Sequence, residues 1–134
     1  MSFRRITQTF QTIKTLGRSY PTYPASRIFA HNMSSAVSQR LSGKTVVVTG
    51  ASSGIGRSTA IEFARTSPKD LKLVVTARRL EALEELKEQI KKEVGEGVKV
   101  LPVKLDVSDP EQVRSFVGNL PEEYRDINIL VNNA

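Results

Sequence analysis

The feature that most constrains the fold of this chain is a glycine-rich turn placed between two periodic segments. Residues 49–56 read Thr-Gly-Ala-Ser-Ser-Gly-Ile-Gly and follow the β-branched run at residues 45–48. A helix-compatible stretch with apolar residues at positions 60, 61, 63 and 64 comes next. A strand that passes through glycines into a helix brings backbone N–H groups and a helix N-terminus up to a phosphate. The alternative is a glycine-rich turn that binds nothing.

Each of the three glycines has a physical purpose in a phosphate-binding turn. Gly50 allows the tight turn, Gly54 lets the backbone approach an anion, and Gly56 lets the helix pack close to the strand. Their spacing is Gly-x-x-x-Gly-x-Gly, which differs from the general Gly-x-Gly-x-x-Gly dinucleotide pattern. The turn is therefore expected to accept a phosphate, although its glycine spacing is not that of the general dinucleotide pattern.

The rest of the chain from residue 44 alternates between strand and helix patterns, which predicts an α/β fold with a parallel sheet. We expect strands at 45–49, 72–76, 98–105 and 127–132, and helices at 55–65 and 80–94 and after Ser108. Pro102 inside the third strand indicates an outer strand. Right-handed crossovers order the strands 3-2-1-4 and place a ligand at the carboxyl ends of strands one and four.

The third helix carries two further expectations. Ser108 and Glu111 have the spacing of a capping box, so Ser108 is expected to cap the helix. Its apolar positions are Val113, Phe116, Val117 and Leu120, and all four are expected to face the sheet.

The basic character of the chain belongs to its N-terminal segment. Residues 1–45 carry seven basic and no acidic residues, whereas residues 46–134 carry 13 basic and 14 acidic residues. This division argues against a nucleic-acid-binding domain, and the leader has too few aromatic residues for base stacking. The chain has no cysteine and a single histidine, His31, so thiolate metal sites, disulfides and a His-based catalytic triad are not expected. No apolar run is long enough to span a membrane.

Residues 1–40 have the marks of a mitochondrial transit peptide: they are rich in Arg, Ser and Thr and lack acidic residues. Apolar residues recur at helical spacing over residues 3–16. The stretch around Phe29 resembles a matrix-processing site, with cleavage expected after Phe29. A start at Met33 would instead give a cytoplasmic product. The alternative is a disordered basic tail ahead of a nucleotide-binding domain at residues 41–134.

The end of the second strand indicates which nucleotide is bound. An NAD site usually carries an acidic residue there, bonded to the ribose 2′-hydroxyl. In this chain Ala77 holds that position and Arg78 and Arg79 follow. A guanidinium can bind a 2′-phosphate bidentately, whereas a carboxylate would repel it. The sequence therefore predicts NADP(H), with Arg78 as its main partner; the alternative is a solvated Arg pair at a helix start.

Several motifs together resemble the short-chain dehydrogenase/reductase family. They are the Thr-Gly-x-x-x-Gly-x-Gly turn, the Arg after strand two, Leu105-Asp106-Val107, and Asn132-Asn133-Ala134 after the fourth strand. The resemblance implies a Rossmann-like doubly wound fold, adenine contact by Asp106, and a chain around Asn133 beside the cofactor ribose. The cofactor-binding residues expected on this basis are Gly50, Ser52, Ser53, Gly54, Ile55, Gly56, Arg78, Arg79, Asp106, Val107, Asn133 and Ala134.

Within the family, residues 77–87 and 120–127 look most like NADP-dependent 3-hydroxy acid dehydrogenases, which oxidise serine, allo-threonine and related acids. The resemblance implies hydride transfer at the CH–OH group of a small hydroxy or carbonyl compound, and a homo-oligomeric intact form. The family's chemistry needs a Ser and a Tyr-x-x-x-Lys pair. Tyr124 is followed by Asn128 and not by Lys, so we assign no catalytic residue and no metal ligand.

The resemblance covers residues 42–134, roughly the N-terminal half of such a protein. We therefore expect the sheet to be truncated after strand four, without the catalytic half. The chain would be a short splice form, an incomplete gene product or an excised piece, inactive by itself. The alternative is a non-catalytic NADP-binding or interaction module that functions at this length.

Overall fold

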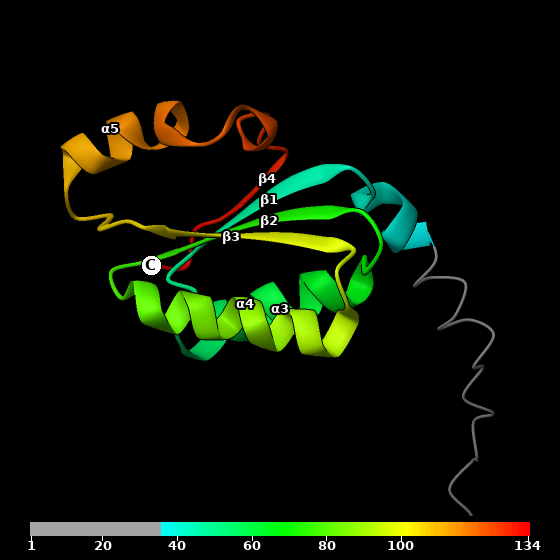
Figure 1. Ribbon diagram of the computed structural model, residues 1–134. Helices are drawn as coiled ribbons and strands as arrows, with labels where there is room; N and C mark the ends of the chain where they lie inside the picture. Colours follow the sequence, from blue (N-terminus) through cyan, green and yellow to red (C-terminus); the bar gives the residue numbers. More distant parts are fainter. Residues whose placement is uncertain (1–35) are drawn as a thin grey trace, which may run out of the picture. The chain divides into compact units, whose positions relative to one another are not determined.

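The computed structural model describes residues 36–134 (Figure 1). The expected leader helix at residues 3–16 and the expected processing site at Phe29 lie outside the described residues. Residues 36–41 are helical, which the sequence did not predict, and Leu41 is buried in the core. Within residues 36–134, the helices are all too short or too polar to cross a bilayer.

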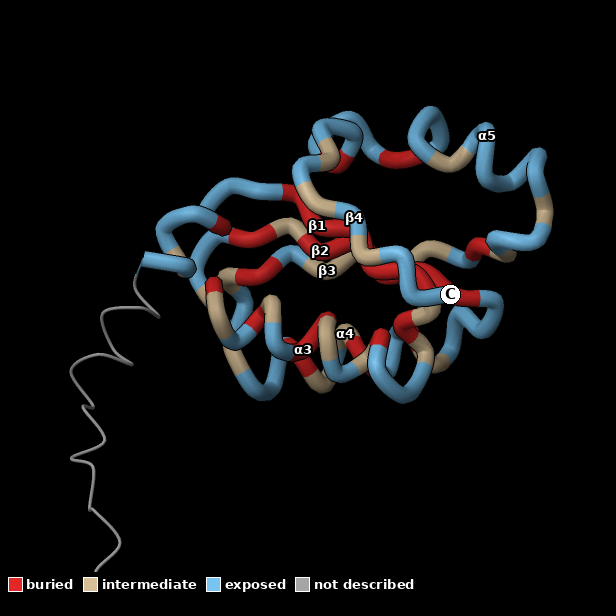
Figure 2. Tube along the Cα trace, turned by 180° about the vertical axis from the view of Figure 1, so that it is seen from behind, coloured by how far each residue is buried: buried red, intermediate tan, exposed pale blue. Residues whose placement is uncertain are grey.

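Four parallel strands form one sheet in the order β3-β2-β1-β4, as predicted. The strands are β1 (Lys44–Thr49), β2 (Leu71–Ala77), β3 (Val98–Lys104) and β4 (Ile129–Val131). Helices α3 (Gly54–Thr66) and α4 (Leu80–Val94) cover one face, and α5 (Pro110–Asn119) lies over the other (Figures 1 and 2). A 3₁₀ turn at Glu122–Tyr124 leads from α5 toward β4.

The sheet is buried on both faces at its centre, which explains why its strands are continuous apolar runs. Val46 and Val48 point into the core under α3 and α4, while Val47 points into the smaller core under α5. All three side chains have no exposed surface. Figure 2 shows this buried layer between the helices. β3 is an edge strand, so the expectation from Pro102 is confirmed.

Helix α4 has the bounds that its sequence pattern predicts. Leu83, Leu86 and Ile90 are fully buried against the sheet, since they recur at helical spacing on one face. Gly95 ends the helix with a positive φ of 86°, a conformation that a side chain would disfavour.

Helix α5 differs from expectation in two respects. Asp109 and not Ser108 caps it: the Asp109 carboxylate accepts hydrogen bonds from the backbone N–H groups of Glu111 and Gln112. Pro110 then takes the first helical position, where a missing N–H costs nothing. Of the four apolar residues expected to face the sheet, Phe116 and Leu120 do so, while Val113 and Val117 are 48% and 44% exposed.

Candidate active site

The carboxyl ends of the strands surround a hollow of about 710 Å³. Residues from the ends of β2 and β3, from the turn after β1 and from the segment after β4 line it together. This is the place where doubly wound sheets bind their ligands, beside the point where the strand order reverses. The lining residues are Gly50, Ser52, Ser53, Thr76, Ala77, Arg78, Arg79, Leu105, Asp106, Val107, Ser108 and Ala134.

The glycine turn brings α3 into direct contact with the end of β1. A Cβ atom on Gly56 would lie 2.3 Å from the Gly50 carbonyl oxygen and 2.5 Å from the Asn133 side-chain nitrogen. No side chain fits at that separation, so Gly56 has the close-packing purpose that its position predicts. Gly54 has a φ of 59° and no atom near its missing Cβ, which leaves this side of the turn open.

The N-terminus of α3 is suited to an anion. Its first turn contains no acidic residue, and the side chain of Ser53 at the N-cap makes no capping hydrogen bond. The first N–H groups of a helix lack intrahelical partners and carry partial positive charge. The Ser53 hydroxyl and these N–H groups are thus free to bind a phosphate.

The Thr49 hydroxyl joins the glycine turn to the segment after β4. It accepts hydrogen bonds from the backbone N–H groups of Asn133 at 2.9 Å and Ala134 at 3.1 Å. The Asn133 side chain then donates to the Gly50 carbonyl at 3.3 Å. Asn133 does not line the hollow, and it acts here by holding the turn and Ala134 in place. The hydropathy pattern alone gave no signal for Thr49, since a polar residue at a strand end is common.

Arg78 and Arg79 follow β2 directly and both line the hollow. Both are exposed, and neither forms an ion pair with any residue in the described range. The last residue of β2 is the buried Ala77, so this strand does not end in a carboxylate. Two unpaired guanidinium groups beside a helix N-terminus favour a ligand with more than one phosphate.

The turn after β3 supplies the opposite wall of the hollow. The Leu105 N–H donates to the Ala77 carbonyl at 3.0 Å, which extends the pairing of β2 and β3. Asp106, Val107 and Ser108 follow and line the hollow. The sequence predicts Asp106 and Val107 as cofactor-binding residues, whereas it gives no such prediction for Ser108 or Thr76.

Thr76 contributes a buried polar group beside the hollow. Its hydroxyl is buried and finds no hydrogen-bond partner within residues 36–134. An unpaired buried hydroxyl is costly, and such groups occur where strain or function compensates. The open turn, the free helix N-terminus and the two guanidinium groups fit NADP(H), and this hydroxyl lies in the same wall.

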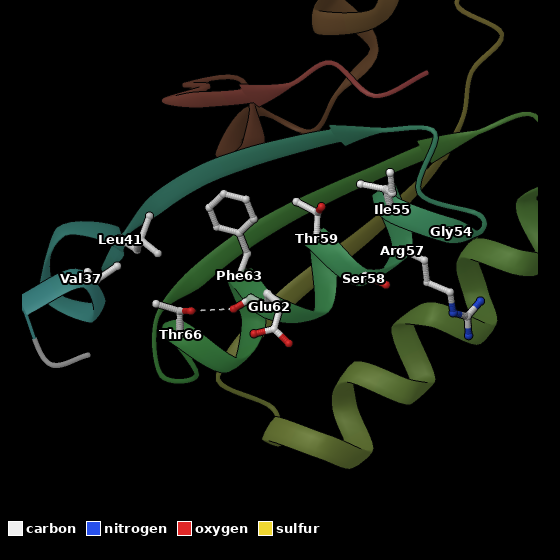
Figure 3. Close-up of a pocket in the computed structure, with 10 residues that line it drawn as sticks. All are labelled: Val37, Leu41, Gly54, Ile55, Arg57, Ser58, Thr59, Glu62, Phe63 and Thr66. Atoms are coloured by element: carbon white, nitrogen blue, oxygen red, sulfur yellow. Dashed lines mark hydrogen bonds between the residues drawn. The ribbon is translucent and has the colours of Figure 1, made fainter. Parts of the chain in front are cut away.

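A second hollow lies on the outer side of α3 and is mostly apolar (Figure 3). Val37, Leu41, Ile55 and Phe63 line this groove, which has a volume of about 770 Å³. Gly54 and Ile55 line this groove and are not among the residues that line the hollow at the strand ends. The Arg57 guanidinium turns away from it and donates to the Gln89 side chain at 2.9 Å. An apolar groove of this kind is typical of a packing surface, and it lacks the charges that a nucleotide needs.

Tyr124 is packed beneath α5 with Val47 and Val74, and it is 7% exposed. Burial, and secondarily the charge of Glu123, raise the pKa of its phenol. Tyr124 therefore lies in a core and not among the residues that line the hollow at the strand ends. Within the described residues, no group of three or more acidic or histidine side chains is close enough to hold a metal ion.

Comparison with known proteins places these motifs in a family context. Residues 44–134 match the sequence profile described as short chain dehydrogenase. The chain is 46% identical over 95 residues to an NADP-dependent 3-hydroxy acid dehydrogenase of Schizosaccharomyces pombe, covering 71% of this chain and 35% of that protein. It is 38% identical over 90 residues to a serine 3-dehydrogenase of Rhizobium radiobacter, covering 67% and 32%.

The solved structures give the same result for the fold. The structure of L-sorbose reductase from Gluconobacter frateurii, complexed with NADPH and L-sorbose, matches with a TM-score of 0.61 and 39% identity. The match covers 70% of this chain and 34% of that one. A metagenomic short-chain oxidoreductase in complex with NADP matches with a TM-score of 0.61 and 31% identity, covering 70% and 40%. The chain thus spans about a third of the length of the relatives that it matches.

Replacing Thr49 by Val should loosen the segment after β4. The substitution keeps the shape but removes the acceptor of the Asn133 and Ala134 N–H groups. We expect faster hydrogen exchange at these two amides and a loss of about 1 kcal/mol in the free energy of unfolding. Thr49→Ser keeps the hydroxyl and is the control. Equal exchange rates in the Val variant and the wild type would contradict the assignment.

Proposed function

This chain belongs to the short chain dehydrogenase family, and we propose that residues 41–134 form the NADP(H)-binding part of an oxidoreductase. The intact enzyme would transfer hydride between NADP(H) and the CH–OH group of a small 3-hydroxy acid or a related carbonyl compound. It would act as a homo-oligomer. The alternative function is a module that binds NADP(H) and catalyses nothing.

The observation that carries the cofactor proposal is the position of Arg78. It follows the strand whose last residue, Ala77, replaces an acidic ribose ligand, and it lines the same hollow as the glycine turn. Its guanidinium would bind the 2′-phosphate, the N-terminus of α3 would bind the pyrophosphate, and Asp106 would contact the adenine. The cofactor supplies hydride chemistry when bound. The described residues bind and orient its adenosine end.

The substrate proposal rests on the relatives. The Schizosaccharomyces pombe protein is an NADP-dependent 3-hydroxy acid dehydrogenase, and the Rhizobium radiobacter protein is a serine 3-dehydrogenase. Both act on substrates with a hydroxyl at the third carbon. The chain spans about a third of each, and the described residues offer no acid–base pair at the strand ends. We therefore propose that residues outside this chain supply the reacting groups in the intact enzyme.

We also propose that residues 1–40 direct the protein to mitochondria. Their support is compositional: seven of the basic residues and none of the acidic ones lie within residues 1–45. Initiation at Met33 would remove most of this segment and leave a cytoplasmic form.

Replacing Arg78 by Ala should weaken NADP⁺ binding selectively. Loss of a charge-assisted contact to the 2′-phosphate should lower NADP⁺ affinity about 10- to 100-fold and leave NAD⁺ affinity unchanged. Isothermal titration calorimetry of the 134-residue chain with each nucleotide measures both. Arg79→Ala is the matched comparison, and we expect a smaller loss from it. An equal loss for NADP⁺ and NAD⁺ in the Arg78 variant would overturn the assignment.

The proposed oxidation of 3-hydroxy acids can be measured on the endogenous protein. When it is captured with an antibody to residues 80–94, we expect reduction of NADP⁺ in the presence of L-serine or L-allo-threonine, followed at the absorbance of NADPH. The same preparation should bind NADP⁺ by calorimetry. Binding of NADP⁺ without turnover of any 3-hydroxy acid would favour the non-catalytic module.

Residues 1–40 fused to a fluorescent protein should carry it into mitochondria, where the intact mass should show cleavage near Phe29. A fusion that begins at Met33 should stay in the cytoplasm and is the control. Diffuse fluorescence from the complete fusion would refute mitochondrial targeting.

A further inference from the structure

The turn after β3 is held in place by the side chain of a residue that lies outside the nucleotide hollow. Gln112 is in the first turn of α5 and lines a separate cavity of about 250 Å³ beneath that helix, together with Leu105 and Phe116. From there its side-chain amide reaches back to the turn that carries Asp106. The sequence pattern gives no signal for Gln112.

Both the oxygen and the nitrogen of the Gln112 side-chain amide form hydrogen bonds. Its oxygen Oε1 accepts a hydrogen bond from the backbone N–H of Asp106 at 3.0 Å. Its nitrogen Nε2 donates to the Asp109 carboxylate at 2.8 Å. The amide group therefore connects the start of the turn to the helix cap at its end. Only a group with an acceptor and a donor on one plane can make both bonds.

The remaining bonds of the turn depend on the same backbone. The Asp106 carboxylate accepts from the Ser108 N–H at 3.0 Å, and the Asp109 N–H donates to the Asp106 carbonyl at 3.1 Å. Asp106, Val107 and Ser108 are the three residues of this turn that face the hollow. Fixing the Asp106 backbone thus fixes the wall of the hollow.

The charges around Asp109 show why an amide is suited to position 112. Hydrogen bonds from the Gln112 side chain, and then from the backbone of Gln112 and Glu111, hold the pKa of the Asp109 carboxyl below its usual value. Asp109 therefore stays charged at neutral pH and requires a donor beside it. A second carboxylate at position 112 would be repelled. The neighbouring charges are Lys104 at the end of β3, which lines the same cavity as Gln112, Asp106 in the turn, Glu111 paired with Arg114 on α5, and the two arginines that line the hollow.

We propose that Gln112 is a positioning residue of the cofactor site: its amide clamps the Asp106 backbone so that Asp106 and Val107 meet the adenosine end of the dinucleotide. This inference rests on the proposed function, because it assigns the wall formed by this turn to NADP(H). Gln112 itself is not among the residues that line the hollow. It acts through the backbone of the turn.

The clamp is tested first without a ligand. In the 134-residue chain, replacing Gln112 by Met keeps the length of the side chain and removes both hydrogen-bonding groups. We expect faster hydrogen exchange at the Asp106 amide. Glu111→Gln is the control, since the Glu111 side chain bonds Arg114 and not the turn. It should leave the Asp106 amide unchanged. An unchanged Asp106 amide in the Met variant would overturn the clamp.

The link to the cofactor is tested with adenosine 2′,5′-bisphosphate, which carries the adenine, the ribose, the 2′-phosphate and the 5′-phosphate but no nicotinamide. Calorimetry should show about five-fold weaker binding to the Met variant, the cost of one lost hydrogen-bonding group. A Met variant that exchanges faster at Asp106 but binds as tightly as wild type would show a purely structural residue and overturn the proposal. A wild-type chain that does not bind this ligand would instead refute the proposed function, whatever the exchange rates show.

Gln112→Glu adds a pH-dependent readout. At neutral pH the introduced carboxylate faces charged Asp109, so binding should be as weak as in the Met variant. The neighbouring negative charge raises the pKa of the introduced carboxyl, so it should take up a proton at a higher pH than a free glutamate does. The protonated group can donate to Asp109 as the amide does, and affinity relative to wild type at the same pH should recover. The Met variant should not recover. A flat ratio of the two affinities across pH 7 to 5 would contradict the clamp.

Discussion

The arrangement of the site depends on one steric constraint, the contact between the start of α3 and the end of β1. Gly56 lies so close to the Gly50 carbonyl and the Asn133 side chain that a Cβ atom would overlap both. This contact directs the N-terminus of α3 toward the strand ends, where its free N–H groups can reach an anion. It also places Asn133 against the turn, so that the segment after β4 borders the same hollow. Any side chain at position 56 would separate these parts.

Side-chain hydrogen bonds to β1 supplement the short backbone pairing of β4. β4 pairs with β1 through three residues, and Leu130 at its centre is 63% exposed. At one end Asn128 exchanges two hydrogen bonds with the Thr45 backbone, each at 2.9 Å. At the other end the Thr49 hydroxyl accepts from the two N–H groups after Asn132. The central strand β1 therefore fixes both ends of its neighbour, and the position of Ala134 in the hollow follows from it.

The sequence predicted the parallel order, the extent of α4 and most of the lining of the hollow, because these follow from strong periodicity and from glycine spacing. It failed for α5. Spacing identifies an apolar stripe but not what covers it, so Val113 and Val117 were expected at the sheet and are half exposed. It also chose Ser108 as the cap, although Asp109 beside Pro110 is the residue whose carboxylate reaches the free N–H groups. Neither Thr76 nor Gln112 could be identified from the sequence. The burial of the Thr76 hydroxyl and the bonds of the Gln112 amide to Asp106 and Asp109 appear only in the folded chain.

The residues that form the candidate cofactor site lie in a different part of the fold from those that would react with a substrate. The site can therefore be described without the reacting groups. The ends of β1, β2 and β3 supply an anion-binding turn, the guanidinium groups of Arg78 and Arg79, and the turn at Asp106, which together match one end of a dinucleotide. That end contributes charge and hydrogen bonding, so it binds but does not react. The mostly apolar groove beside Ile55 and the exposed Leu130 of β4 are not part of this lining. Under the proposed function, recognition of NADP(H) would be a local property of three neighbouring strand ends, separable from the residues that act on a substrate.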